Sequence, residues 1–197
     1  MPQQQDSREK LISVAVDLFA DRGFKGTSIR DIANAMGMSI SNIYHYFGNK
    51  EGLLLAILET TSKSLVEQLR KVSEAESDPL SRFQLLLKTH IKLSTVWKKE
   101  AKIFFLDEEH LSPEGNEANL NYQREVLDIY RHQLQSLKDS GYIKARSLTV
   151  LAFNILGVIN WNLRWYRPDG SMSLEEVSRE IIDFVLHGVL GSGKREV

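Results

Sequence analysis

The sequence predicts an all-α protein, and three observations support that prediction. Apolar residues recur at helical intervals over long segments, and the alternation of β-branched residues that marks strands is absent. Proline, which interrupts helices, occurs at only 4 of the 197 positions. We therefore expect helices separated by short breaks, with an N-terminal three-helix domain at residues 6–52 joined by a long helix to a larger helical domain at residues 53–191.

The first predicted helix covers residues 6–22 and ends at Gly23, because glycine readily takes the left-handed conformation found at helix C-termini. Its apolar side chains recur on one side, as expected for a helix that packs against a core. They are Leu11, Ile12, Ala15, Leu18 and Phe19.

Residues 28–47 predict two short helices joined by a tight turn. Ser28 and Asp31 have the spacing of a capping box, so Ser28 can begin the first of them. Gly37 suits its C-terminus, and Ser39 can cap the second. Two short helices joined in this way form the helix-turn-helix that reads DNA.

On the second of these helices, Ile43 and Phe47 lie four residues apart and face the first helix, which turns the opposite side to solvent. Hydroxyl groups, cations and helix N-termini suit contacts with phosphates, whereas amide and apolar side chains can read base edges. We expect phosphate contacts from Thr27, Ser28, Tyr44, His45 and Lys50, and base contacts from Arg30, Ile40, Ser41 and Asn42. Ser39, the cap of this helix, also belongs to the predicted DNA-binding residues.

The fourth predicted helix covers residues 49–74, so its start can belong to the N-terminal domain and its end to the next one. This makes it the expected mechanical link between the two domains. Further helices are predicted at residues 80–98, 102–109, 116–140, 147–166 and 173–190.

A set of short runs between residues 11 and 55 carries a family resemblance. They are Leu18-Phe19, Gly23-Phe24, Thr27-Ser28-Ile29, Ile32-Ala33, Gly37-Met38-Ser39, Ile43-Tyr44, Tyr46-Phe47, Lys50-Glu51 and Leu53-Leu54. In them the chain resembles the DNA-binding domain of the TetR/AcrR family of transcriptional regulators, which implies binding to a double-stranded DNA operator and repression relieved by a ligand. Ile40 stands where many relatives carry a polar or basic residue and Ser41 where many carry Gly, so the resemblance does not imply an operator sequence.

The charge of the N-terminal segment is balanced, which is unusual for a DNA-binding domain. Residues 1–52 hold Arg8, Lys10, Arg22, Lys25, Arg30 and Lys50 against Asp6, Glu9, Asp17, Asp21, Asp31 and Glu51. We therefore expect DNA binding through a few placed contacts, with modest non-specific affinity and a shallow salt dependence.

The last two predicted helices are more apolar than the others. Residues 147–166 are apolar on nearly every side, and a helix of that kind is buried all round, either in the core of one domain or against a second subunit. Helix-turn-helix proteins usually bind two half-sites, which favours a homodimer. The predicted interface residues are Leu156, Ile159, Ile181, Phe184, Val185 and Val189.

Aromatic side chains gather in the C-terminal part, and aromatic walls with a few polar groups line small-molecule pockets, although aromatic residues at helical spacing can also be core. The predicted ligand-binding residues are Trp97, Phe104, Phe105, His110, Tyr122, Tyr130, Trp161, Arg164 and Trp165. Residues 104–134 and 160–177 resemble the acyl-CoA-responsive branch of the TetR/AcrR family. That resemblance implies a small-molecule effector such as an acyl-CoA, with an apolar tunnel for its acyl chain.

Other classes of protein fit the sequence poorly. There is no Cys, the N-terminus lacks the apolar segment of a signal peptide, and the longest apolar stretch, residues 148–159, is shorter than the roughly 20 residues that cross a bilayer. We expect a cytoplasmic protein with no membrane partner, metal or resident cofactor. The alternative is a helical interaction module whose helix-turn-helix no longer binds DNA.

An enzyme is the weakest alternative, and we predict no catalytic residues. Asp107 and His110 have the spacing of one half of a di-iron site, but no second copy of the motif follows. Residues 188–194 have the letters of a phosphate-binding loop, but Arg195 replaces the required Ser or Thr and no helix follows.

Overall fold

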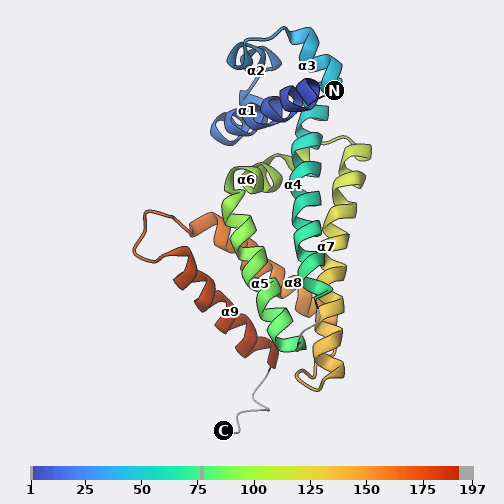
Figure 1. The fold of residues 1–197 in the computed structure, drawn as a ribbon, viewed down its shortest axis with the longest axis vertical. Coiled ribbons are helices and arrows are strands. Elements are labelled where there is room, and N and C mark those ends of the chain that lie inside the picture. The colour runs from blue at the N-terminus through green and yellow to red at the C-terminus, as the bar shows by residue number, and fades with distance from the viewer. Residues whose placement is uncertain (1, 76–77, 191–197) are drawn as a thin grey trace. The chain divides into compact units, whose positions relative to one another are not determined.

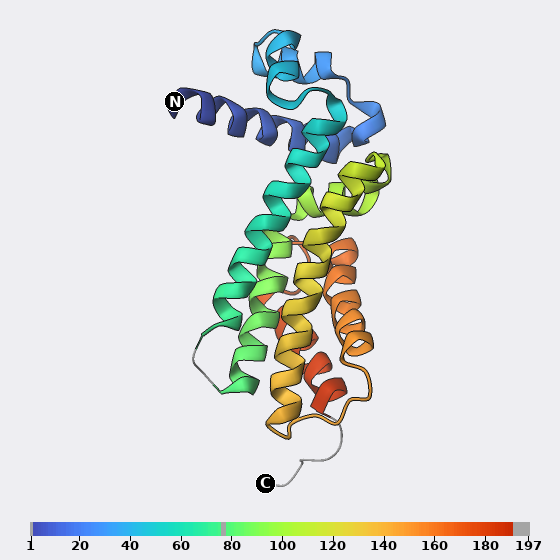
Figure 2. The same ribbon diagram turned by 90° about the vertical axis from the view of Figure 1, so that its right-hand side faces the viewer.

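The computed structural model describes residues 2–75 and 78–190, and in that part of the chain all regular elements are helices, which confirms the predicted fold class (Figure 1; Figure 2). They are α1 (Pro2–Gly26), α2 (Ile29–Met36), α3 (Ile40–Phe47), α4 (Lys50–Ser73), α5 (Pro79–Val96), α6 (Lys98–Asp107), the 3₁₀ turn η1 (Glu108–His110), α7 (Pro113–Asp139), α8 (Leu148–Trp165) and α9 (Leu174–Leu190).

The first helix differs from its prediction at its C-terminal end. Gly23 has φ 73° and ψ 164°, and the chain is helical again as far as Gly26, so the predicted end is a break inside α1. The break frees the N–H of Phe24, which donates to Oδ1 of Asp107 at 3.3 Å. The hydroxyl of Thr27 donates to the carbonyl oxygen of Gly23 at 3.1 Å and so fixes the same turn.

The chain divides into two compact units. Unit 1 comprises Met1–Lys63 and Trp97–Tyr122, and unit 2 comprises Ser64–Val96 and Gln123–Val197. The predicted boundary between residues 52 and 53 lies inside α4, and the division of the chain there stays a prediction. Residues 97–122 group with the N-terminal helices because α6 packs along α1.

Unit 1 has one apolar core, to which α1, α2, α3, α4 and α6 each contribute. The fully buried side chains at its centre include Leu11, Phe19, Ile32, Ile43, Leu53, Ile57 and Ile103. Polar contacts reinforce the packing of α6 on α1: the ammonium of Lys99 lies 2.6 Å from Oδ1 of Asp17, and Lys102 donates to the carbonyl oxygen of Ala20. The N–H of Ser112 donates to Glu51 at 2.6 Å, and this hydrogen bond lowers the pKa of the Glu51 carboxyl.

In unit 2, α5, α8 and α9 pack against one another (Figure 1). Helices α4 and α7 contribute further buried apolar residues to unit 2, among them Leu69, Leu134 and Leu137. Buried polar groups are paired at one end of α7, where Gln133 accepts from the Arg82 guanidinium at 2.8 Å and donates to the hydroxyl of Ser73 at 2.7 Å. Across residues 2–75 and 78–190, no helix combines the length and the apolar character needed to cross a bilayer.

Candidate nucleic-acid interface

The helix-turn-helix consists of α2 and α3, and its local geometry is the one that the sequence predicts. The hydroxyl of Ser28 accepts the N–H of Asp31 at 3.1 Å, and the Asp31 carboxylate accepts the N–H of Ser28 at 2.8 Å, which completes a capping box and lowers the pKa of Asp31. At the other end Gly37 is left-handed, with φ 62°, and the N–H of Met38 donates to the carbonyl oxygen of Ala33 at 3.0 Å. These contacts fix the turn that leads into α3.

One face of α3 is free to meet DNA. The hydroxyl of Ser39 caps the helix by accepting the N–H of Asn42 at 3.3 Å, and Ile43 is fully buried against the core of unit 1. The side chains on the outer face are exposed, as predicted: Ser41, Asn42, Tyr44 and His45. Ile40 is half-buried and packs against the core, so only part of its side chain is available for apolar contact with a base.

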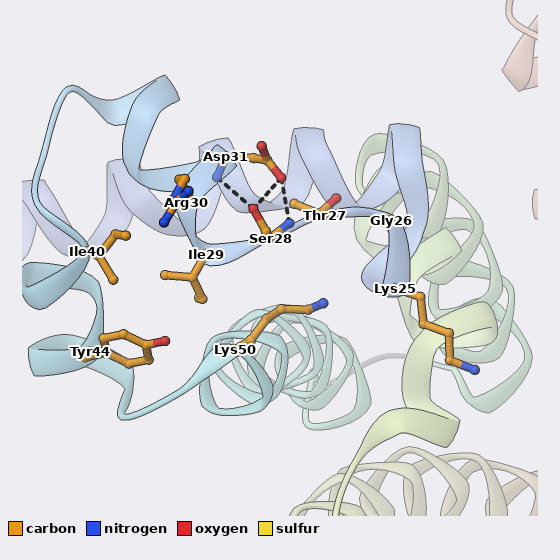
Figure 3. A pocket seen from close by; sticks show the side chains of 10 residues that line it. All are labelled: Lys25, Gly26, Thr27, Ser28, Ile29, Arg30, Asp31, Ile40, Tyr44 and Lys50. Atoms are coloured by element: carbon orange, nitrogen blue, oxygen red, sulfur yellow. Dashed lines mark hydrogen bonds between the residues drawn. The ribbon is translucent and has the colours of Figure 1, made fainter.

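A pocket of about 550 Å³, open to solvent, lies where the start of α2, the outer face of α3 and the start of α4 come together (Figure 3). Its lining brings together residues predicted from separate parts of the motif: Lys25, Gly26, Thr27, Ser28, Ile29, Arg30, Asp31, Ile40, Tyr44 and Lys50. The lining includes three cations, Lys25, Arg30 and Lys50, and one carboxylate, that of Asp31, which Ser28 already engages. The pocket is therefore locally cationic although the segment as a whole is neutral.

Lys50 is the cation whose position depends most on packing. Its Nζ lies 4.1 Å from the centre of the Phe24 ring, a cation–π contact that holds the side chain at the pocket. Partial burial lowers the pKa of Lys50, and the nearby Asp107 carboxylate opposes that shift. Figure 3 shows Lys50 and the Tyr44 hydroxyl projecting toward the segment that leads into α2. An ammonium, a phenol O–H and a helix N-terminus in one pocket can bind a phosphate.

Two predicted phosphate contacts are constrained by their partners. Thr27 is 1% exposed, and its hydroxyl donates to the carbonyl oxygens of Leu18 and Gly23 rather than outward. The hydroxyl of Ser28 is engaged with Asp31 in both directions. The first N–H groups of a helix have no acceptor inside it. The capping box engages the N–H groups of Ser28 and Asp31, so the N–H groups of Ile29 and Arg30 remain available at the start of α2. Any anion at this end of α2 would meet backbone rather than the two hydroxyls.

Comparison with known proteins decides the family. The family described as "Tetracyclin repressor-like, C-terminal domain" matches residues 76–189, and "Bacterial regulatory proteins, tetR family" matches residues 11–57. The chain belongs to the TetR family of bacterial regulatory proteins.

Relatives of known name cover almost the whole chain. The HTH-type transcriptional repressor KstR2 of Rhodococcus jostii (strain RHA1) is 27% identical over 184 residues, which are 92% of this chain and 90% of the relative. The fatty acid metabolism regulator protein of Bacillus subtilis (strain 168) is 22% identical over 198 residues, 96% of this chain and 98% of the relative. Among solved structures, AibR in complex with isovaleryl coenzyme A and operator DNA has a TM-score of 0.81 at 28% identity, with 93% of this chain and 98% of that chain covered.

These comparisons make the TetR-family chain a DNA-binding transcriptional regulator and not an enzyme, as the sequence predicts. In the described part of the chain, no group of three or more His, Cys, Asp or Glu residues is placed to hold a metal ion. Asp107 and His110 lie 4.0 Å apart, but Asp107 also accepts the N–H of Phe24 and His110 stacks on the Phe24 ring. The pair therefore belongs to the packing of unit 1. The end of the phosphate-loop-like run, residues 191–194, lies outside the described residues.

The nine predicted ligand-binding residues of this TetR-family chain are divided between the units. Unit 1 holds Trp97, Phe104, Phe105, His110 and Tyr122, and unit 2 holds Tyr130, Trp161, Arg164 and Trp165. In unit 2 only Tyr130 is buried, whereas Trp161 and Trp165 are 62% and 51% exposed and the Arg164 guanidinium lies over the Trp161 ring. These three side chains of α8 thus form exposed surface of the protomer rather than an enclosed wall.

The predicted dimer residues also differ in accessibility. Ile159, Ile181, Val185 and Val189 are buried inside unit 2, Leu156 is half-buried, and Phe184 is 67% exposed. A side chain that its own core covers leaves little surface for a partner. The apolar side chains that α8 and α9 expose are Val150, Phe153, Trp161, Trp165 and Phe184.

Two buried polar residues of unit 2 were not predicted as part of any site. His90 on α5 is 3% exposed, and its Nδ1 lies 2.9 Å from the hydroxyl of Tyr130. Asn162 on α8 is 1% exposed, and neither atom of its amide has a hydrogen-bond partner in the described residues. Their positions in the sequence could have identified both residues as buried, because each is a polar residue on an otherwise apolar stripe of its helix.

Proposed function

We propose that the protein is a cytoplasmic, homodimeric repressor that binds a two-fold symmetric operator through α3 and is released from it by an acyl-CoA thioester. The observation that carries the effector is the similarity, over nearly the full length of both chains, to AibR, which was solved with isovaleryl coenzyme A and operator DNA. The similarity to a fatty acid metabolism regulator points to the same class of ligand.

DNA contacts divide into two kinds in this proposal. Lys50, Tyr44 and the backbone start of α2 bind phosphate, because they share one locally cationic pocket beside the exposed face of α3. Ser41 and Asn42 read base edges, because their side chains are exposed on the first turn of α3. Phosphate contacts set the register of the protein on the duplex, and base contacts set sequence preference.

The homodimer follows from the geometry of such readers, which place two recognition helices in successive major grooves about 34 Å apart. The exposed apolar side chains of α8 and α9 support the proposal, because large apolar patches on a regulator of this size mark protein contacts. An effector then acts by favouring a state in which the two reading helices no longer fit both half-sites.

The test is fluorescence anisotropy with a labelled DNA fragment from upstream of the protein's own gene, titrated with protein and then with isovaleryl-CoA and longer acyl-CoAs. We expect specific binding over a scrambled fragment, and at least one acyl-CoA should weaken it by about tenfold, a typical allosteric coupling. Coenzyme A without an acyl group is the matched control and should leave binding unchanged.

Two results would count against the proposal separately. Specific DNA binding that no acyl-CoA alters would reject the effector and keep the regulator. Failure to select any sequence from a random DNA library would reject operator binding and favour a helical interaction module.

A further inference from the structure

The amide of Asn162 is the most unusual polar group in unit 2. On α8, Ala152, Ile155, Ile159 and Asn162 recur at intervals of three and four residues and are all buried, so Asn162 occupies a position on the stripe that faces the core. Its nitrogen and its oxygen are both buried and both lack a hydrogen-bond partner in residues 2–75 and 78–190. The position therefore supplies one unused donor group and one unused acceptor.

Such a side chain is costly in a core that serves packing alone. Burial removes the amide from water. Without a new hydrogen-bond partner, the free energy of hydration that the amide loses is not compensated. Leu has nearly the same size and no polar atom, so packing alone would favour Leu at this position. A buried polar group without a protein partner requires one from outside the chain, which a bound ligand or an ordered water can supply.

The buried polar side chains of unit 2 are uncharged throughout the described residues. They are His90, Ser94, Gln133, Asn162 and Ser178, together with two buried tyrosines, Tyr130 and Tyr166. Burial lowers the pKa of His90 to about 4, so the imidazole is neutral at pH 7. Helix α5, which carries His90 and, one turn later, Ser94, packs against α8. An ionised carboxylate or phosphate placed in this core would meet no buried cation.

We infer that Asn162 is an effector-binding residue and that the group it holds is neutral, with a carbonyl to accept from the amide nitrogen and an N–H or O–H to donate to the amide oxygen. The inference rests on the proposed function, because it takes the acyl-CoA as the effector. In an acyl-CoA, the thioester and the pantetheine arm carry carbonyl and amide N–H groups without charge, whereas the nucleotide end is ionised. The arm or the thioester binds at Asn162, the charged end does not, and a free fatty acid lacks the group that the site holds.

The test compares the full-length protein with Asn162→Leu and with Asn154→Leu, a matched control that makes the same change at an exposed position of α8. Isothermal titration uses four probes: octanoyl-CoA, octanoyl-pantetheine, octanoate and N-octylacetamide, a neutral amide without the nucleotide. Asn162→Leu should weaken the two thioesters and the amide by about tenfold, the loss of one or two hydrogen bonds, whereas Asn154→Leu should not. The wild-type protein should bind both thioesters more tightly than octanoate.

Thermal unfolding without ligand gives a second readout that needs no effector. Asn162→Leu should unfold at a higher temperature than the wild-type protein, because it removes the unpartnered amide. A lower unfolding temperature together with unchanged binding would show that an ordered water or the protein itself satisfies the amide, and would overturn the inference. Octanoate binding as tight as that of octanoyl-CoA would overturn the neutral group.

Failure of the inference and failure of the proposed function give different results. Octanoyl-CoA bound equally by the wild-type protein and Asn162→Leu overturns the role of Asn162 and leaves the acyl-CoA effector in place. N-octylacetamide bound through Asn162, with no binding of octanoyl-CoA, rejects the acyl-CoA effector and supports the neutral site. Binding of no probe by the wild-type protein overturns both.

Discussion

His90 allows a direct measurement of how well the core of unit 2 excludes water. Its imidazole is 3% exposed and hydrogen-bonded to the Tyr130 hydroxyl at 2.9 Å. Burial lowers the pKa of His90 from its ordinary 6.5 to about 4, because the charged imidazolium would lose its hydration. Burial also raises the pKa of Tyr130, so both partners are neutral at pH 7.

The sign and size of the effect on stability follow from proton linkage. The unfolded chain binds a proton at His90 below pH 6.5, whereas the folded protein binds one only near pH 4. The unfolded state thus holds more protons between these values, and stability falls as the pH is lowered through that range. At about 1.4 kcal/mol for each pH unit, His90 costs about 2 kcal/mol of unfolding free energy at pH 5 and about 3 kcal/mol at pH 4, relative to pH 8.

The assay compares the wild-type protein with His90→Gln, which keeps a polar partner for Tyr130 but does not titrate. Hydrogen exchange of the amides in α5 measures the free energy of opening of unit 2 at pH 5 and pH 8. We expect the wild-type protein to lose about 2 kcal/mol more than His90→Gln between the two pH values. The matched control, His45→Gln on the exposed face of α3, should follow the wild-type protein.

Equal pH dependence of the wild-type protein and His90→Gln would refute the reasoning. A histidine resonance assigned to His90 that titrates with a midpoint near 6.5 would refute it independently, because that value belongs to a solvated imidazole.

Four further substitutions test the interface and its scaffold. Lys50→Ala should weaken binding to specific and scrambled DNA alike and reduce the salt slope of log affinity by about 0.9, whereas Asn42→Ala should relax preference at one base position by about 1–3 kcal/mol; an unchanged salt slope would reject the phosphate contact. Ser28→Ala should lower the free energy of unfolding of unit 1 by about 1 kcal/mol in urea denaturation, because it removes the cap of α2, and no change would mean that the cap contributes nothing. Phe184→Asp should convert dimers to monomers in sedimentation velocity and weaken operator binding, and a dimer that persists would exclude that face of α9.

The ends of α2 and α3 could be predicted from the sequence because neighbouring residues determine them. Ser28 and Asp31 form the capping box that their spacing predicts, and Gly37 is left-handed where a C-terminus was expected. Gly23 shows the limit of such local signals. The helix continues past it with a break, and the partner of the freed Phe24 N–H is Asp107, 83 residues away. No pattern around Gly23 reveals that contact.

The accessibility of side chains could be predicted from the sequence for α3 but not for α8. Exposure on α3 follows from one buried residue, Ile43, and the helical period. Helix α8 is apolar on nearly every side, so the helical period does not reveal which side is buried. Ile159 and Trp161 are both apolar in the sequence, although Ile159 is fully buried and Trp161 is exposed. His90 lies on the buried, largely apolar stripe of α5, so its position was a sequence signal of burial that its residue type concealed.

In unit 1 the Phe24 ring connects part of the C-terminal family match to the start of α4. Residues 97–122 fall within the C-terminal family match, 76–189, yet they pack with the N-terminal helices. The Phe24 ring joins the two: Lys50 lies 4.1 Å from its centre and the His110 ring stacks at 5.3 Å, while Asp107 accepts the Phe24 N–H. His110 lies in η1 and Asp107 is the last residue of α6, so a shift of this segment against α1 would disturb the contacts that both residues make with Phe24. Since the Phe24 ring also holds Lys50 at the pocket, such a shift would move a proposed phosphate contact, whereas the capping box and Gly37 keep the geometry of α2 and α3 unchanged.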